Sequence, residues 1–362
     1  MSAIAFCAIG TMSPAFSNYL NAARIGAALA VLLFHWTILS GEHQWYRSLK
    51  IGADAVVVFF VLSGFLVAYT ADTKDRTLGR YAFNRATRLY SVLVPAIGLT
   101  LAVGFVLGYS NTIVDVLRAV TFTGHIWNGW THPDPNGAIW SVIYEAWYYA
   151  IFGCLFYLRD WRGVVFAVMA IVIAGPNILV LMPCWWLGVG VYRRLQRPVR
   201  ANVASAMAFV PVLSYVLLHA TGALREIHDL TSIPFKATLL HVSVHFLRDW
   251  VVAILFAIHL IGVASLMRGR EAKWQPGVTW AAGATFSLYL THLPVLKFMM
   301  AVMLTHRWLG IAACIAVASI FAWAFERRLG TFRQLLKGAA ARMALRPATS
   351  PTGPVAHDRY RF

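Results

Sequence analysis

The stretch IGADAVVVFFVLSGFLVAY occupies residues 51–69 and contains a single charged residue, Asp54. Two similar apolar stretches follow at Leu89–Leu107 and Val164–Met182. Each is close to the length of about 20 residues with which a helix crosses the hydrocarbon core of a bilayer. This pattern predicts a chain built from membrane-spanning helices.

The composition of the whole chain favours a lipid bilayer as its surroundings. Of the 362 residues, 59% are hydrophobic and only 12% are charged, which is about half the charged share of a soluble domain. The net charge is +17, but the basic residues lie mainly at the ends of apolar runs, so we expect no nucleic-acid partner. The four cysteines show no paired spacing that would predict a disulfide framework or a zinc site.

We predict an all-α, polytopic transmembrane helical bundle of about ten spans. The predicted spans, in chain order, are Leu20–Ser40, Ile51–Tyr69, Leu89–Leu107, Ala138–Leu158, Val164–Met182, Pro183–Leu195, Asn202–Ala220, Trp250–Met267, Val278–Leu304 and Leu309–Phe325. The sixth is short and begins at a proline, so it is either a full span or a re-entrant piece.

The orientation follows from the loops between these spans. Lys and Arg concentrate in one alternating set, which includes residues 74–88, 193–200, 268–273 and 327–361. Because basic loops stay on the cytoplasmic side, we expect both termini to face the cytoplasm. Residues 1–19 have no basic start and are predicted to be a lead-in rather than a cleaved signal peptide. Residues 20–326 form the predicted transmembrane domain, and 327–362 a basic, largely disordered cytoplasmic tail.

The first predicted span carries two ionisable residues, Arg24 and His35, eleven positions apart. Eleven helical residues make three turns plus about 20°, so both side chains share one face, about 16 Å apart along the axis. Glu42, seven residues further, continues this face if the helix extends. Ionisable groups inside a span are costly and commonly mark a functional path. The alternatives are snorkelling of Arg24 to lipid headgroups and a structural hydrogen bond for His35.

The chemistry of the two side chains suggests different roles. Guanidinium groups suit phosphate, and imidazole suits proton transfer near neutral pH. The pair therefore predicts a phosphate-bearing substrate near Arg24 and a proton-transfer step near His35.

Several motifs follow one another along nearly the whole chain: NAARIGAALAVLLFHW (residues 21–36), AVVVFFVLSGFLV (55–67), FNRATRL (83–89), WSVIYEAWYY (140–149), SLYLTHLP (287–294) and FERRL (325–329). In this order they resemble the motifs of the acyltransferase-3 family of integral membrane O-acyltransferases. One departure is Val57, which stands where many members have an aspartate, with Asp54 three residues earlier. That difference puts any carboxylate role on the second helix in doubt.

The resemblance implies a reaction. An acyl group, most commonly acetyl, would pass from cytoplasmic acyl-CoA to a hydroxyl of an extracytoplasmic or lipid-linked glycan, in a bacterial inner membrane. Acetyl-CoA is the expected donor, and no metal is expected. Arg24, Arg85 and Arg88 would bind the phosphates of coenzyme A, although Arg85 and Arg88 are equally consistent with ordinary positive-inside residues.

The same resemblance suggests further site residues. Ser63 and Gly64 would make a narrow opening for the pantetheine arm, or simply permit close helix packing. The catalytic residues would be His35, Glu42 and Glu145, with His35 as general base.

Trp140, Tyr289 and His292 would line the substrate site, with packing as the alternative for Trp140 and a structural hydrogen bond for His292. Two alternatives to the general base remain open: a covalent acyl-histidine relay, and a transporter whose path is lined by Arg24, His35 and Glu145. The acceptor and the oligomeric state are not predicted.

Overall fold

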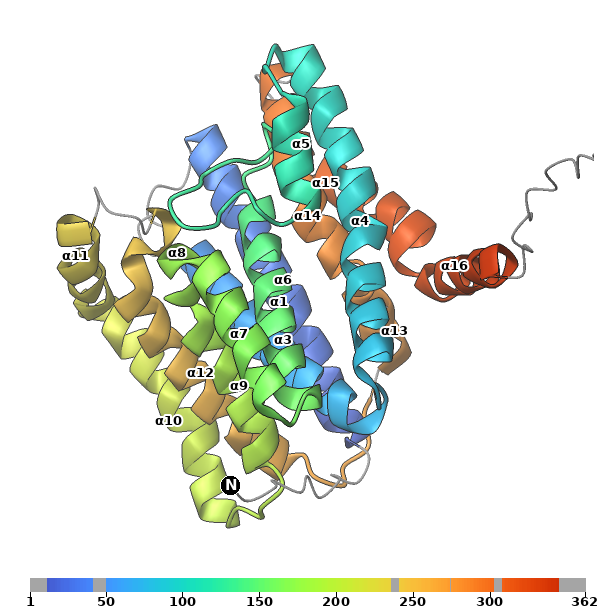
Figure 1. The fold of residues 1–362 in the computed structure, drawn as a ribbon. Helices are drawn as coiled ribbons and strands as arrows, with labels where there is room; N and C mark the ends of the chain where they lie inside the picture. Colours follow the sequence, from blue (N-terminus) through green and yellow to red (C-terminus); the bar gives the residue numbers. More distant parts are fainter. Residues whose placement is uncertain (1–11, 42–49, 236–240, 274, 303–307, 345–362) are drawn as a thin grey trace, which may run out of the picture.

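The structure, a computed structural model, describes residues 12–41, 50–235, 241–273, 275–302 and 308–344. Within these residues it is built of helices and turns, with no strand (Figure 1). The helices are α1 (Pro14–Ser40), α3 (Ile51–Thr73), α4 (Leu78–Leu107), α5 (Ile113–Val120), α6 (Ile139–Tyr157), α7 (Trp161–Ala174), α8 (Pro176–Leu179), α9 (Met182–Arg194), α10 (Ala201–Ala220), α11 (Ala223–Phe235), η1 (His241–His245), α12 (Phe246–Leu266), α13 (Gln275–Ala282), α14 (Thr285–Val302), α15 (Leu309–Phe321), η2 (Ala322–Glu326) and α16 (Leu329–Ala344). The predicted all-α fold is confirmed.

The described residues contain slightly fewer candidate spans than the approximately ten predicted. Among the described residues, eight helical segments are long and apolar enough to cross a membrane, or nine if one bent pair counts as a span. That pair, 161–174 with 176–194, bends by 108°. The predicted fifth and sixth spans are therefore covered by three short helices, α7, α8 and α9, rather than by two full-length spans.

The bend has a local cause that the hydrophobic pattern conceals. Gly175 has φ 76°, a conformation that residues with a β-carbon rarely adopt. Pro176 follows and lacks the amide hydrogen that would continue α7. The apolar run Val164–Met182 is thus divided at Gly175, although no polar residue interrupts it there.

Other helix boundaries also differ from the predicted ones. Helix α1 begins at Pro14, within the predicted lead-in, because Ser13 caps it by accepting a hydrogen bond from the Phe16 amide. The predicted span Val278–Leu304 is split into α13 and α14. Helix α16 occupies Leu329–Ala344, where we expected the start of a disordered tail. Its alanine, leucine, lysine and arginine residues favour a helix.

Helix α3 lies at the centre of the bundle and packs against α1, α9 and α12. Its contact with α9 is close because Gly64 lies against the backbone carbonyl of Trp185, and Gly188 against that of Val61. By contrast, many apolar side chains of α7 and α10 are exposed, including Phe166 and Phe209. This distribution is expected of helices whose outer faces contact lipid.

The basic loops meet at one end of the bundle, which we call the basic end. Arg268 donates a hydrogen bond to the Leu195 carbonyl at 2.8 Å, and Arg333 donates one to the Asn84 carbonyl at 2.8 Å. The first bond joins the segments after α9 and α12, and the second joins α16 to the start of α4. Figure 1 shows α16 projecting sideways from the bundle.

Candidate active site

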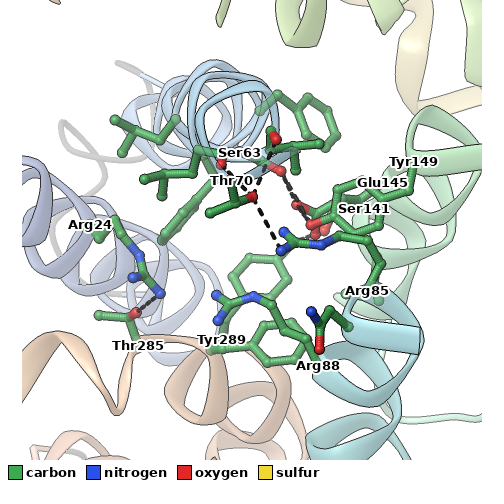
Figure 2. Close-up of a pocket in the computed structure, with 18 of the residues that line it drawn as sticks. Arg24, Ser63, Thr70, Arg85, Arg88, Ser141, Glu145, Tyr149, Thr285 and Tyr289 are labelled. Atoms are coloured by element: carbon green, nitrogen blue, oxygen red, sulfur yellow. Dashed lines mark hydrogen bonds between the residues drawn. The ribbon is translucent and has the colours of Figure 1, made fainter. Parts of the chain in front are cut away.

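A cavity of about 370 Å³ lies between α1, α3, α4, α6 and α14, with α16 at its edge (Figure 2). We call it the central cavity. Its polar lining side chains are Arg24, Ser63, Thr70, Lys74, Asp75, Asn84, Arg85, Arg88, Ser141, Glu145, Tyr149, Thr285, Tyr289 and Arg333. The lining holds more cationic than anionic groups, which makes the cavity suitable for an anion.

Two of the predicted phosphate-binding residues face the cavity without an ionic partner. Arg24 of α1 donates a hydrogen bond to the Thr285 hydroxyl at 3.2 Å. The Arg88 guanidinium of α4 lies over the Phe286 ring, 5.9 Å from its centroid. Within the described part of the chain, no carboxylate oxygen lies within 4 Å of either guanidinium. Both therefore retain donors for a ligand.

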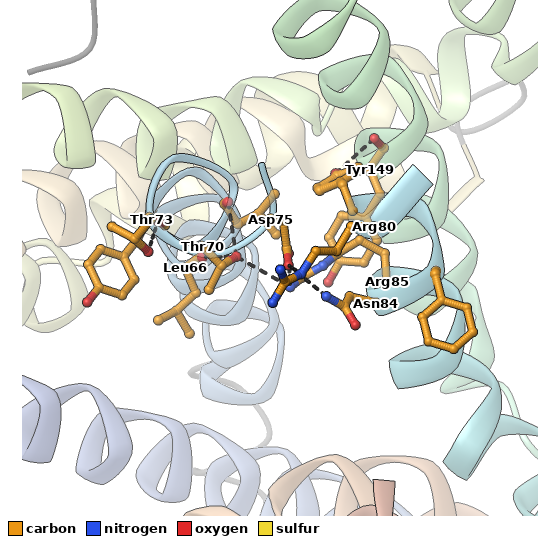
Figure 3. Close-up of polar contacts among 12 residues, drawn as sticks. Leu66, Thr70, Thr73, Asp75, Arg80, Asn84, Arg85 and Tyr149 are labelled. Atoms are coloured by element: carbon orange, nitrogen blue, oxygen red, sulfur yellow. Dashed lines mark hydrogen bonds and ion pairs between the residues drawn. The ribbon is translucent and has the colours of Figure 1, made fainter. Parts of the chain in front are cut away.

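Arg85, the third predicted phosphate ligand, already has a partner (Figure 3). One of its nitrogens lies 3.3 Å from a carboxylate oxygen of Asp75 and donates to the Thr70 hydroxyl at 3.3 Å. Asn84 donates to the other Asp75 oxygen at 2.6 Å. The charge of Arg85 is thus largely balanced. Asp75, which is almost completely buried, carried no signal in the sequence that pointed to this contact.

Arg333 of α16 is a lining residue that the sequence analysis assigned to the disordered tail. Its Nε donates to the Thr87 hydroxyl, and one terminal nitrogen to the Asn84 carbonyl, each at 2.8 Å. Both acceptors are on α4: Thr87 directly precedes Arg88, and Asn84 lies one turn before it. The last described helix is thereby attached at the rim of the central cavity.

The carboxylate of Glu145 is held by two hydroxyl groups. Ser63 of α3 and Tyr149 of α6 both donate to its Oε1 atom, Tyr149 at 2.6 Å. Trp185 of α9 donates to the Ser63 hydroxyl at 3.1 Å. The carboxylate of Glu145 is thus joined to Ser63 and Tyr149 (Figure 2).

Tyr289 of α14 connects the central cavity with the two predicted histidines. Its hydroxyl lies 2.7 Å from that of Ser141, and both residues line the cavity. One turn along the helix, His292 has its ring centre 5.9 Å from that of Tyr289. His292 contacts His35 of α1, with 3.1 Å between ring nitrogens. Neither histidine is a lining residue, so the pair lies beside the cavity.

The sequence matches the family described as an acyltransferase domain over residues 17–327, which is most of the chain. The chain belongs to the acyltransferase-3 family. The arginine pair, the histidine pair and the lining of the central cavity, except Leu329 and Arg333, therefore lie within the matched region.

Two curated relatives share part of this acyltransferase-3 chain. The exopolysaccharide production protein ExoZ of Rhizobium meliloti (strain 1021) is 32% identical over 157 residues, 40% of this chain and 46% of the relative. The O-acetyl transferase of Shigella phage Sf6 is 30% identical over 151 residues, 38% of this chain and 45% of the relative. The match thus spans about half the length of each relative. No solved structure matches the chain.

Four of the described site residues predicted for this acyltransferase-3 protein do not line the central cavity: His35, Gly64, Trp140 and His292. Gly64 faces α9, where the absence of a β-carbon permits close helix packing. This arrangement favours the packing alternative over the opening for the pantetheine arm. Trp140 packs edge-on against Phe60, with 6.0 Å between ring centres. Glu42 falls outside the described residues. Where the structure describes the chain, no group of three His, Cys, Asp or Glu side chains could hold a metal ion.

Proposed function

We propose that this protein is an integral membrane O-acyltransferase that transfers an acetyl group from acetyl-CoA to a hydroxyl group of a glycan. The observation that carries the proposal is the central cavity. It exposes the guanidinium groups of Arg24 and Arg88 and extends to Tyr289, which adjoins the histidine pair. An anion site next to a proton acceptor is what transfer from a phosphate-bearing thioester requires.

The donor would bind through its phosphates. Coenzyme A carries a diphosphate and a 3′-phosphate, and Arg24 and Arg88 have donors available for such groups. Arg85, balanced by Asp75, would position this part of α4. The thioester would then extend along the cavity past Ser63 and Glu145 toward Tyr289.

His35 would act as the general base. It takes the proton of the acceptor hydroxyl while that oxygen attacks the thioester carbonyl. The new carbon–oxygen bond forms, the carbon–sulfur bond breaks, and the protonated imidazole returns its proton to the departing thiolate. Free coenzyme A and an O-acetylated product result, and the histidine regains its neutral form.

The proposed acceptor and orientation follow from the relatives and from the basic end. The relatives are named for exopolysaccharide production and O-acetyl transfer, which favours a polysaccharide or lipid-linked glycan. The basic end holds most basic loops, so it would face the cytoplasm of a bacterial inner membrane with both termini. Acetyl-CoA would enter there, and the glycan would meet the histidine pair from the opposite side.

The proposal is tested with purified protein in lipid nanodiscs. Acetyl-CoA binding is measured calorimetrically, and mass spectrometry of surface glycans compares cells with and without the gene. We expect His35→Ala to abolish transfer while leaving acetyl-CoA binding nearly intact. The matched control is His259→Ala, because His259 bonds to Tyr19 and to the Ala208 carbonyl, away from the central cavity. The control should keep its transfer activity.

Two outcomes would overturn the proposal. Normal transfer by His35→Ala would remove this residue from the mechanism. A wild-type protein that neither binds nor hydrolyses acetyl-CoA, but carries a small anion across the bilayer, would instead be a transporter.

A further inference from the structure

His35 and His292 come from helices far apart in the sequence, α1 and α14, and meet through their ring nitrogens. Nε2 of His292 lies 3.1 Å from Nδ1 of His35. His292 is 1% exposed, whereas His35 is only partly buried. A neutral imidazole has one donor and one acceptor nitrogen, so the partners of each nitrogen decide where the hydrogen lies.

The backbone fixes the hydrogen of His292. Its Nδ1 lies 2.7 Å from the Tyr289 carbonyl oxygen and 3.3 Å from that of Leu288. Because a carbonyl oxygen only accepts hydrogen bonds, Nδ1 must carry the hydrogen. The Nε2 atom of neutral His292 is therefore an acceptor, and it is directed at His35.

The same reasoning fixes the hydrogen of His35. Its Nδ1 lies 3.0 Å from the Val31 carbonyl oxygen and 3.1 Å from Nε2 of His292. Both neighbours are acceptors, so Nδ1 of His35 carries the hydrogen and shares it between them. The lone pair of His35 then lies on Nε2, for which no partner is found among the described residues.

We infer that His292 is a positioning residue that holds His35 as the Nδ1–H tautomer, with Nε2 free to accept a proton from the acceptor hydroxyl. The inference rests on the proposed role of His35 as general base. It also explains why His292 is not itself the base, since both its nitrogens are occupied and its side chain is enclosed. In serine hydrolases a carboxylate orients the catalytic histidine, whereas here a neutral imidazole does so.

When Nε2 of His35 takes the proton, the ring becomes a cation with hydrogen on both nitrogens. The Nδ1–H bond to Nε2 of His292 then becomes charge-assisted and shorter. His292 thereby stabilises the transient imidazolium without taking its proton. A purely structural histidine would have no such effect on the rate.

The experiment compares two variants of equal side-chain length. His292→Gln supplies an amide oxygen near the position of Nε2, and His292→Met supplies no comparable acceptor. We expect His292→Met to lower kcat by about 10- to 100-fold with an unchanged KM for acetyl-CoA. His292→Gln should restore most of the rate. Equal kcat values for His292→Met and the wild type would overturn the inference.

The tautomer itself is read by solid-state ¹⁵N NMR of histidine-labelled protein, with the His35 signals assigned from the spectrum of His35→Ala. The wild type should show hydrogen on Nδ1 and none on Nε2 of His35. Hydrogen on Nε2 instead would overturn the inference, even if the Met variant fails to fold. Normal transfer by His35→Ala would overturn the proposed function but leave this tautomer measurement valid, so the two failures are distinguishable.

Discussion

Asp54 of α3 and Arg248 of α12 form a buried ion pair, with 2.7 Å between a carboxylate oxygen and a guanidinium nitrogen. The two residues are 3% and 2% exposed. Tyr215 of α10 donates to the same carboxylate at 2.8 Å, so the cluster joins three helices. Asp54 lies three residues before Val57, the position that departs from the family pattern, and none of the cluster lines the central cavity.

The pair should matter for stability rather than for catalysis. Asp54→Asn leaves the Arg248 charge buried, where Asp249, 3.8 Å from its other terminal nitrogen, compensates only in part. Loss of one partner of a buried pair costs about 3 kcal/mol, which should lower the thermal unfolding midpoint in detergent. The double variant Asp54→Asn with Arg248→Met should regain part of this loss. A single variant as stable as the wild type would contradict the assignment.

We expect Arg88 to bind the donor, and not only to act as one of the basic residues that orient the protein in the membrane. Arg88→Ala removes an arginine without an ionic partner, so we expect weaker acetyl-CoA binding by about 10- to 100-fold, in line with charged hydrogen bonds of about 1.5–3 kcal/mol. Arg162→Ala is the control, because this side chain is 68% exposed and pairs with Asp160 at the surface. Calorimetric titration that gives both variants the same affinity would favour the positive-inside explanation for Arg88.

A substitution at Gly64 distinguishes its role in helix packing from the predicted role in a narrow opening for the pantetheine arm of the donor. A β-carbon there would collide with the Trp185 backbone, so Gly64→Ala should destabilise the protein by about 1–3 kcal/mol through overpacking. The folded fraction should keep its KM for acetyl-CoA. Gly98→Ala, in α4 with open space around the added carbon, should be neutral or slightly stabilising. A raised KM for Gly64→Ala without loss of stability would support the donor opening instead.

His132 lies in the loop between α5 and α6, outside the spanning helices. Burial lowers the pKa of this histidine below its ordinary value. The unfolded loop therefore binds more protons than the folded loop, and its stability should fall as the pH falls below about 6.5. Amide exchange of residues 124–136, corrected for intrinsic rates, should be faster at pH 5.5 than at pH 7.5. His132→Gln should remove this difference, and an equal pH response in that variant would exclude His132 as its cause.

The membrane-helical fold and the ionisable side chains inside the spans can both be predicted from the sequence alone. Long apolar runs in a bilayer adopt helices, because a helix pairs its own backbone hydrogen-bonding groups and unpaired groups are too costly in lipid. Arg24 and His35 share a face of α1 through helical periodicity alone, which involves only neighbouring residues. The relative positions of two side chains on one helix can be calculated from their spacing in the sequence. This calculation is sufficient to place Arg24 and His35 on the same face.

Which of these side chains contact one another depends on how the helices pack in the tertiary structure. The break at Gly175 results from backbone geometry, which the spacing of apolar residues does not encode. The ion pair of Arg85 with Asp75 and the contact of His35 with His292 result from packing between segments, which spacing does not encode either. Arg333 reaches α4 from a helix some 250 positions away in the chain. Partners between helices depend on how the helices pack, and in this protein packing is set by small residues such as Gly64 and by buried pairs such as Asp54 with Arg248.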